Sequence, residues 1–367
     1  MKDLVSNKGV ILVDKKPEDY VFGGETKLGY EEVLPLGNWN EFLPTNERQS
    51  NGVEDYMNCV SQAGHNSLET QLNRLTGQNL MPQGLLNIAK TMGWIDDEGH
   101  WNFNDCFTAK MAGTSHRGLT MPKFWDCVRH NGLLGEGDWH KTSDNLKWDD
   151  YYIEIPQELK NRALEFLKWF TIEYEWLWDS PPSVNYNLLE KNLKQAPIHV
   201  ATATCSPWSY NVVPSCGASA SHATMVFNNV KDYIEDFDTY EPFKKKLAPN
   251  YVIHQAMKGV VRPKTFSINI SQVAYIYCLR DDVALAFPGS NKFYSTVEPT
   301  YSIYDWCRDY GVYDNPEVFI DNILDYSKIN KGRVEEASQI DPQIKKKRFS
   351  LFLCLNNFWT WLLSLLS

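Results

Sequence analysis

A cysteine, a histidine and a carboxylate could together carry out acyl-transfer chemistry in this chain. Cys59 lies at the predicted start of a helix, where unpaired backbone N–H groups and the helix dipole favour an anion. We therefore expect its thiol to be more acidic than usual, and the thiolate is the nucleophile. His222 could hold the proton and Asp238 could orient the imidazole. Alternatively, Cys59 is a small buried hydrophobic residue, as many free cysteines are.

The element that would position Cys59 is an amphipathic helix in the second half of the segment 49–75. Its apolar residues recur near the helical period and predict one buried face. They are Met57, Val60, Ala63, Leu68, Leu72 and Leu75. Asp55 and Asn58 offer oxygen atoms that could cap the start of the helix.

His222 and Asp238 are expected on neighbouring strands of a hairpin. His222 opens the apolar run HATMVFNNV, and Asp238 lies near the end of the run DYIEDFDTY. A hairpin brings the start of its first strand close to the end of its second, so the two side chains would be neighbours. Asp236 or Asn228 could stand in for Asp238 as the carboxylate or amide partner.

The order of these residues resembles that of the papain family of cysteine peptidases. Three further segments carry the resemblance, which covers residues 34–263. They are the stretch from Leu34-Pro35 through Trp39 to Gln49, HNGLLGEGDWH at 130–140, and APIHVATATC at 196–205. The surroundings of Cys59 depart from the family motif, and Asp238 stands where papain has an asparagine.

The resemblance implies a fold, a reaction and a set of site residues. The fold would be α+β and two-lobed, with the cysteine helix in a helical N-terminal lobe and an antiparallel β C-terminal lobe. Cys59 would attack a peptide carbonyl, His222 would exchange the proton, and Asp238 would orient His222. Gln49 would bind the oxyanion, although it lies farther before the cysteine than in the family. Asn58 or Gln62 could supply that donor instead, and Tyr240 stands where a shielding tryptophan is expected.

The function expected from this resemblance is peptide-bond hydrolysis through a Cys-His-Asp triad and an acyl-enzyme, with a peptide or protein as substrate. One alternative is a structural or interaction protein that keeps the papain fold, viral or membrane-associated, with weak or no catalysis. Another is a cysteine-dependent acyl transferase, because the same pair can form amides. We expect no cofactor and no metal, since the eight histidines show no metal-ligand spacing.

Composition places further bounds on partners and compartment. A net charge of −10 argues against nucleic acid as a partner. The basic runs at 244–246 and 345–348 are interpreted as solvated local features. The eight cysteines form no framework and favour reduced thiols in a cytoplasmic protein, although Cys205 and Cys216 bracket a loop and could be bridged. The first twenty residues do not resemble a signal peptide.

The chain divides into four predicted parts. Residues 1–33 form an N-terminal extension, too short and too little helical for a papain-type inhibitory prosegment. Residues 34–265 form the papain-like domain, with a helical lobe at about 56–180 and a β lobe at about 196–265. Within the helical lobe, residues 156–178 are expected to be helical. Residues 266–343 form a partly β extension without a readable motif.

The last part, residues 344–367, is a basic and then almost charge-free tail. It is barely long enough to span a bilayer. The pattern favours an amphipathic helix that binds a membrane surface or a partner protein. Alternatively, the tail is a C-terminal helix packed on the body of the protein.

Overall fold

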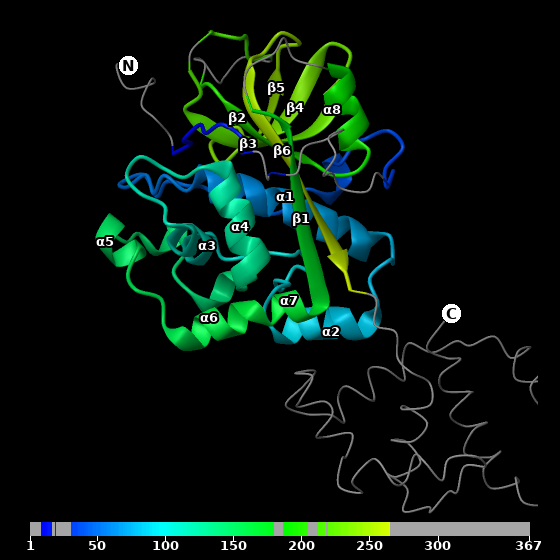
Figure 1. Ribbon diagram of the computed structural model, residues 1–367. Helices are drawn as coiled ribbons and strands as arrows, with labels where there is room; N and C mark the ends of the chain where they lie inside the picture. Colours follow the sequence, from blue (N-terminus) through cyan, green and yellow to red (C-terminus); the bar gives the residue numbers. More distant parts are fainter. Residues whose placement is uncertain are drawn as a thin grey trace, which may run out of the picture. The chain divides into compact units, whose positions relative to one another are not determined.

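The computed structural model describes residues 9–16, 19, 31–179, 186–204, 212–217 and 219–264 (Figure 1). The expected C-terminal extension at 266–343 and the expected tail helix at 344–367 lie outside these residues. Within the described ranges, no helix is both long and apolar enough to cross a membrane.

Helices dominate the first half of the described chain. They are α1 (Cys59–Gly77), α2 (Gln83–Thr91), α3 (Asp105–Ala112), α4 (Met121–Asn131), α5 (Trp148–Tyr151), α6 (Gln157–Leu164) and α7 (Phe166–Trp169). Side-chain caps fix two of the starts, because Asn104 accepts from the Phe107 N–H and Thr120 accepts from the Lys123 N–H.

Helix α1 differs from the expected amphipathic helix because it is buried on every side. All residues from Cys59 to Arg74 are buried, polar ones included. Two of the polar side chains bond to backbone groups of other segments: Glu69 accepts from the Phe103 N–H, and Gln71 donates to the Gly259 carbonyl. Apolar periodicity could not reveal this, since buried polar residues with partners look like a solvated face in sequence.

The second half is an antiparallel sheet with the strand order β1-β6-β2-β3-β4-β5. The strands are β1 (Phe170–Trp178), β2 (Ile198–Thr202), β3 (His222–Val230), β4 (Tyr233–Phe237), β5 (Lys244–Leu247) and β6 (Ile253–Pro263). Helix α8 (Tyr186–Leu193) precedes β2. The expected α+β class, with a helical half that carries Cys59 followed by an antiparallel β half, is confirmed.

Strand β1 corrects the helix expected over 156–178. That helix ends at Trp169, and the chain then pairs with β6 from Phe170 to Trp178. The sequence FTIEYEWLW alternates apolar with other residues over its first seven positions, which is the two-residue period of a strand. The helical period of the preceding residues therefore does not continue past Trp169.

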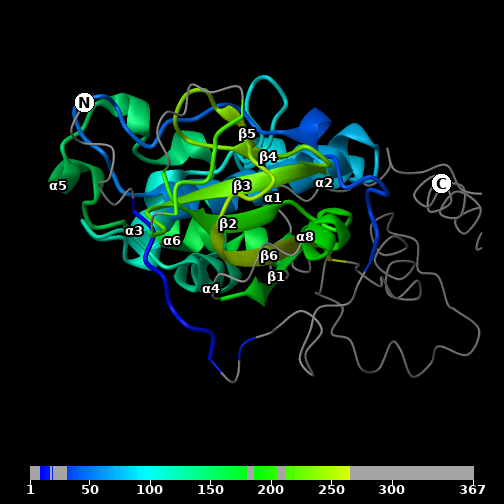
Figure 2. The ribbon, with the colours of Figure 1, turned by 90° about the horizontal axis from the view of Figure 1, so that it is seen from above.

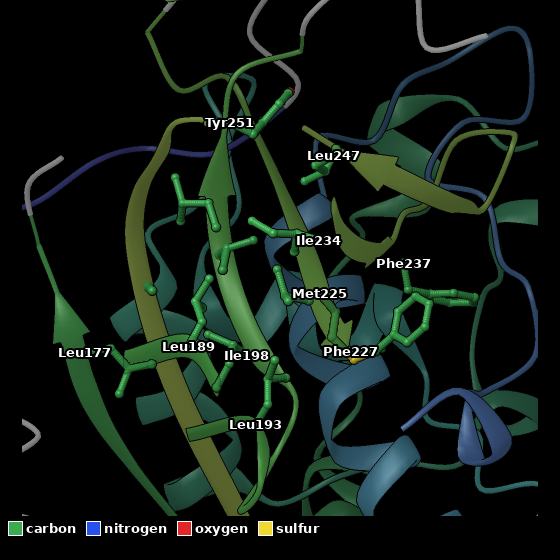
Figure 3. Close-up of a cluster of buried hydrophobic side chains, with 14 of the residues drawn as sticks. Leu177, Leu189, Leu193, Ile198, Met225, Phe227, Ile234, Phe237, Leu247 and Tyr251 are labelled. Atoms are coloured by element: carbon green, nitrogen blue, oxygen red, sulfur yellow. The ribbon is translucent and has the colours of Figure 1, made fainter. Parts of the chain in front are cut away.

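Apolar side chains from the sheet and α8 form one large core cluster (Figure 3). Ile198 and Met225 come from neighbouring strands, and Leu189 and Leu193 come from α8. Seen from above in Figure 2, α1 runs along the sheet, and it packs against β2, β3 and β6. The sheet therefore holds β3, and with it His222, directly against the helix that starts at Cys59.

Candidate functional site

His222 and Asp238 are hydrogen-bonded to each other in the described structure. His222 Nε2 lies 2.6 Å from Asp238 Oδ1, and both side chains are fully buried. The β3–β4 pairing that was expected from sequence produces this contact: Met225 pairs with Phe237, so the chain after β4 returns to the start of β3. The Asp238 N–H donates to the Phe243 carbonyl, which fixes the turn beyond the hairpin.

The orientation of the His222 ring leaves its other nitrogen available. Among the described residues, Nδ1 has no hydrogen-bond partner, although it is buried. The Tyr240 ring packs near the imidazole, with ring centroids 5.4 Å apart. Tyr240 therefore occupies the position where the resemblance placed a shielding aromatic residue. The bond from Nε2 to Asp238 makes Nδ1 the nitrogen that could exchange a proton.

Cys59 lies beside the start of β3. Its Sγ accepts a hydrogen bond from the backbone N–H of Ala223, the residue after His222. The side chain has no exposed surface. The expectation of an acidic thiol is wrong for this state: burial raises the pKa of Cys59 well above its usual value, and the negative charges of Asp55 and Asp238 raise it further. The loss of hydration on burial raises the pKa of the thiol by more than the helix N-terminus lowers it.

Gln49 also lies in the site, and the loop after it explains its distance from the cysteine. Ser50 and Asp55 form a bridge, and the Tyr56 N–H donates to the Gln49 carbonyl, so residues 50–55 close on themselves. Residues 50–55 therefore form a small loop between Gln49 and the segment that leads to Cys59. Its Oε1 accepts from the hydroxyl of Thr239, next to Asp238, at 3.1 Å.

Asp55 holds the amide that the resemblance assigned to the oxyanion. Gln49 Nε2 donates to Asp55 Oδ1 at 2.6 Å, and the Met57 N–H donates to the same oxygen at 3.0 Å. The other carboxylate oxygen accepts from the Tyr240 hydroxyl. In this arrangement the Gln49 amide is bound to a negative group instead of being directed at a substrate oxygen.

The two alternative oxyanion donors have other partners. Asn58 Nδ2 donates to the Tyr151 hydroxyl at 3.3 Å, and Gln62 Nε2 donates to the Arg48 carbonyl at 3.2 Å. Asn58 precedes α1 but makes no side-chain cap to it, contrary to expectation.

The alternatives to Asp238 do not contact His222 in the hydrogen bonds described. Asn228 donates to Glu235, at 2.6 Å. Asp236 is buried one strand position before Phe237, and burial together with the Asp238 charge raises its pKa well above the usual value.

Lys245 is a site residue that sequence reasoning missed. Its Nζ lies 2.5 Å from Asp238 Oδ2, and both side chains are fully buried. The run at 244–246 was interpreted as solvated, which is wrong for its middle residue. In strand β5 the side chains alternate between faces, so Lys244 is exposed while Lys245 points inward. In a strand KKKL, Lys245 lies on the same face as the apolar Leu247, which is buried. This alternation could have indicated from sequence that Lys245 points inward.

Residues 9–13 pack against residues close to Cys59. The Leu119 N–H donates to the Gly9 carbonyl, and the Ile11 N–H donates to the Leu119 carbonyl. Gly9 fits so tightly that an added Cβ would lie 2.3 Å from the Met57 carbonyl oxygen, two residues before Cys59. Farther along, the Val13 carbonyl accepts from Gln255 of β6. This segment thus contacts both the helical half and the sheet.

A polar cavity of about 640 Å³ lies on the Gln49 side of the site. Arg48, Glu241 and a group of acidic residues line it, namely Glu47, Asp105 and Glu136. Asp105 Oδ1 lies 2.7 Å from Nδ1 of His65, which is buried below the cavity. Burial raises the pKa of Asp105 to about 7 and lowers the pKa of His65 to about 3, so the pair is not a simple ion pair.

The described residues contain both free thiols and a disulfide-bonded cysteine. Over the ranges that the structure covers, no three His, Cys, Asp or Glu side chains are arranged to hold a metal ion. Cys59, Cys106 and Cys127 are free thiols. Cys216 is in a disulfide, which departs from the reduced thiols that were favoured and agrees with the alternative that this cysteine could be bridged.

Comparisons with known proteins give a distant likeness only. No protein family model and no curated protein matches the chain. Among solved structures it is similar to digestive procathepsin L 3 from the larval midgut of Tenebrio molitor (12% identity, TM-score 0.42, covering 71% of this chain and 76% of that one). It is also similar to xylellain, a cysteine protease from Xylella fastidiosa (10% identity, TM-score 0.46, 71% and 97%). A cysteine protease from Carica candamarcensis matches with 13% identity and a TM-score of 0.37, over 62% and 97% of the two chains.

Proposed function

We propose that this chain is a cysteine peptidase that cleaves peptide bonds through an acyl-enzyme. The observation that carries the proposal is the joint placement of Cys59 at a helix start, its Sγ on the Ala223 N–H, and His222 bonded to Asp238 through Nε2. In the first step Cys59 Sγ attacks the peptide carbonyl and its proton passes to His222 Nδ1. The same proton then goes to the leaving amine, and water hydrolyses the thioester.

Gln49 completes the site in this proposal once its amide leaves Asp55. Its Nε2 would then donate to the oxyanion, together with first-turn N–H groups of α1, which have no acceptor within their own helix. The state described here is a covered one, because Cys59 is fully buried and its pKa is raised. Attack therefore requires solvent or substrate to reach the thiol.

The same burial favours a second candidate, a binding or structural protein with little or no turnover. In that case the contacts of Cys59, Asp55 and Gln49 hold the chain together and never open. The two candidates differ in one measurable property, the access of an electrophile to Cys59.

Active-site titration tests the proposal. The full chain is incubated with an epoxide inhibitor of papain-type peptidases, and the labelled residue is identified by mass spectrometry. We expect one label per chain on Cys59, its loss in His222→Ala, and no label on Cys106 or Cys127, the other free thiols of the described residues. Absence of label on Cys59 in the folded protein would favour the second candidate. A fluorogenic peptide pool with an added amine then separates hydrolysis from acyl transfer.

A further inference from the structure

We propose that Lys245 is a positioning residue that cancels the charge of Asp238, so that this carboxylate orients His222 as a neutral acceptor would. The inference rests on the proposed function, because it concerns the same proton transfer. It adds a fourth member to the Cys59, His222 and Asp238 arrangement, supplied by strand β5 at the edge of the sheet.

The contacts divide the Asp238 carboxylate between the His222 ring and the Lys245 ammonium. Oδ1 faces His222 Nε2 at 2.6 Å and also accepts the Thr239 N–H at 2.6 Å. Oδ2 faces Lys245 Nζ at 2.5 Å. The lysine is held in place by a second bond to the Tyr240 carbonyl, at 2.6 Å. Each oxygen therefore has its own partner, and the ammonium lies on the side of the carboxylate away from the ring.

Burial strengthens the interaction between the Asp238 carboxylate and the Lys245 ammonium. The side chains of His222, Asp238 and Lys245 have no exposed surface, so water does not screen their charges. Burial by itself would raise the pKa of Asp238, but His222 and Lys245 together lower it well below its usual value. Asp238 therefore stays ionised, and the ammonium balances its charge.

Other ionisable groups near the pair come from three segments. Asp236 lies opposite Lys245 in the β4–β5 register, but its raised pKa keeps it protonated over a wider pH range than an ordinary carboxyl. Asp55 and Tyr240 bond to each other, and Tyr240 also borders the pair, since its N–H donates to Asp238 Oδ1 and its ring packs near the imidazole. Within this set, Lys245 is the cation whose Nζ bonds directly to the carboxylate that holds the imidazole.

The lysine should control how readily the His222 ring is protonated. A bare carboxylate beside an imidazole favours imidazolium, whereas a carboxylate already paired with an ammonium adds little net charge. Without the ammonium, the carboxylate charge should stabilise the imidazolium form, so that the ring stays protonated up to a higher pH. Removal of both the Lys245 ammonium and the Asp238 carboxylate charge should bring the protonation of the ring back close to that of the wild type.

The test is a proton titration of His222 in the full chain, followed by nitrogen NMR with ¹⁵N-labelled histidine and assigned with His222→Gln. Wild type is compared with Lys245→Met and with the double variant Asp238→Asn/Lys245→Met. The matched control is Lys244→Met, on the same strand but exposed, with its Nζ on Asn40. The titration needs no substrate, so it can fail or succeed independently of active-site labelling.

We expect Lys245→Met to move the His222 midpoint upward by roughly one pH unit or more, about a tenfold change in proton affinity. The double variant should lie within about 0.3 unit of wild type, as should Lys244→Met. If Lys245→Met does not fold, a folded double variant with the wild-type midpoint supports the inference. An unchanged midpoint in Lys245→Met, equal shifts in both variants, or loss of folding in both would overturn it.

Discussion

Asp105→Asn should stabilise the protein at alkaline pH. Asp105 opens α3 beneath the polar cavity, is only 5% exposed, and bonds to His65. Its neighbours include Glu47 and Glu69, whose pKa values are also raised by burial and by nearby carboxylates. Asparagine keeps an acceptor oxygen for His65, and its Nδ2 can donate to Glu47 once that carboxyl, which donates to Asp105 in the wild type, offers an oxygen instead. The substitution thus keeps the contacts and removes the charge.

The magnitude follows from the difference between folded and unfolded proton affinity. Burial raises the pKa of Asp105 to about 7, against about 3.9 in an unfolded chain, so at 1.36 kcal/mol per unit ionisation costs up to about 4 kcal/mol. Because the folded state binds the extra proton, its contribution is fully present below about pH 4 and is lost as the pH rises through about 7. Wild type therefore loses this stability at pH 8, whereas the asparagine variant retains it.

Urea unfolding followed by tryptophan fluorescence at pH 5 and pH 8 measures this effect. We expect the variant to exceed wild type by roughly 1.5 kcal/mol at pH 5 and by up to about 4 kcal/mol at pH 8. Asp150→Asn, at an exposed position of α5, is the matched control and should leave both values unchanged. A variant less stable than wild type at pH 8 would show that the buried carboxylate is favourable as an ion, contrary to this reasoning.

Three further outcomes are expected. Asp55→Asn should move the alkylation profile of Cys59 to lower pH, because the Asp55 charge raises the pKa of that thiol; an unmoved profile would mean that the charge is not felt there. Removal of residues 1–15 should speed alkylation of Cys59 by an epoxide or iodoacetamide, because Gly9 packs on the backbone of Met57, two residues before Cys59. Equal alkylation rates with and without these residues would show that another segment controls access to the thiol. Gly64→Ala should lower stability by about 1–3 kcal/mol in urea unfolding, because the new Cβ would lie 2.1 Å from an aromatic ring of α4, whereas Gly137→Ala meets no atom and should be neutral.

The sequence by itself predicted a helical part followed by strands, and it predicted Asp238 as the partner of His222, with Asp236 or Asn228 as alternatives. Local patterns carry this information: the helical period after Cys59, and two strand-like runs joined by a short polar turn. Because antiparallel hairpins bring fixed positions together, the neighbourhood of His222 and Asp238 could be predicted without knowing the rest of the fold. The alternation in FTIEYEWLW was also local, and the strand at Phe170–Trp178 was missed only because a helix was extended through it.

Only the tertiary structure decided what surrounds these groups. Burial of Cys59 by distant segments reverses the expected acidity of its thiol, since desolvation depends on every element packed around it. Asp55 was predicted as a cap but holds the Gln49 amide, because a loop closes between them. Lys245 was expected to be solvated like the two lysines beside it, but its place in the edge strand β5 directs its side chain inward onto Asp238. The charges that surround a buried group come from several chain segments, so their balance cannot be predicted from any one segment of the sequence.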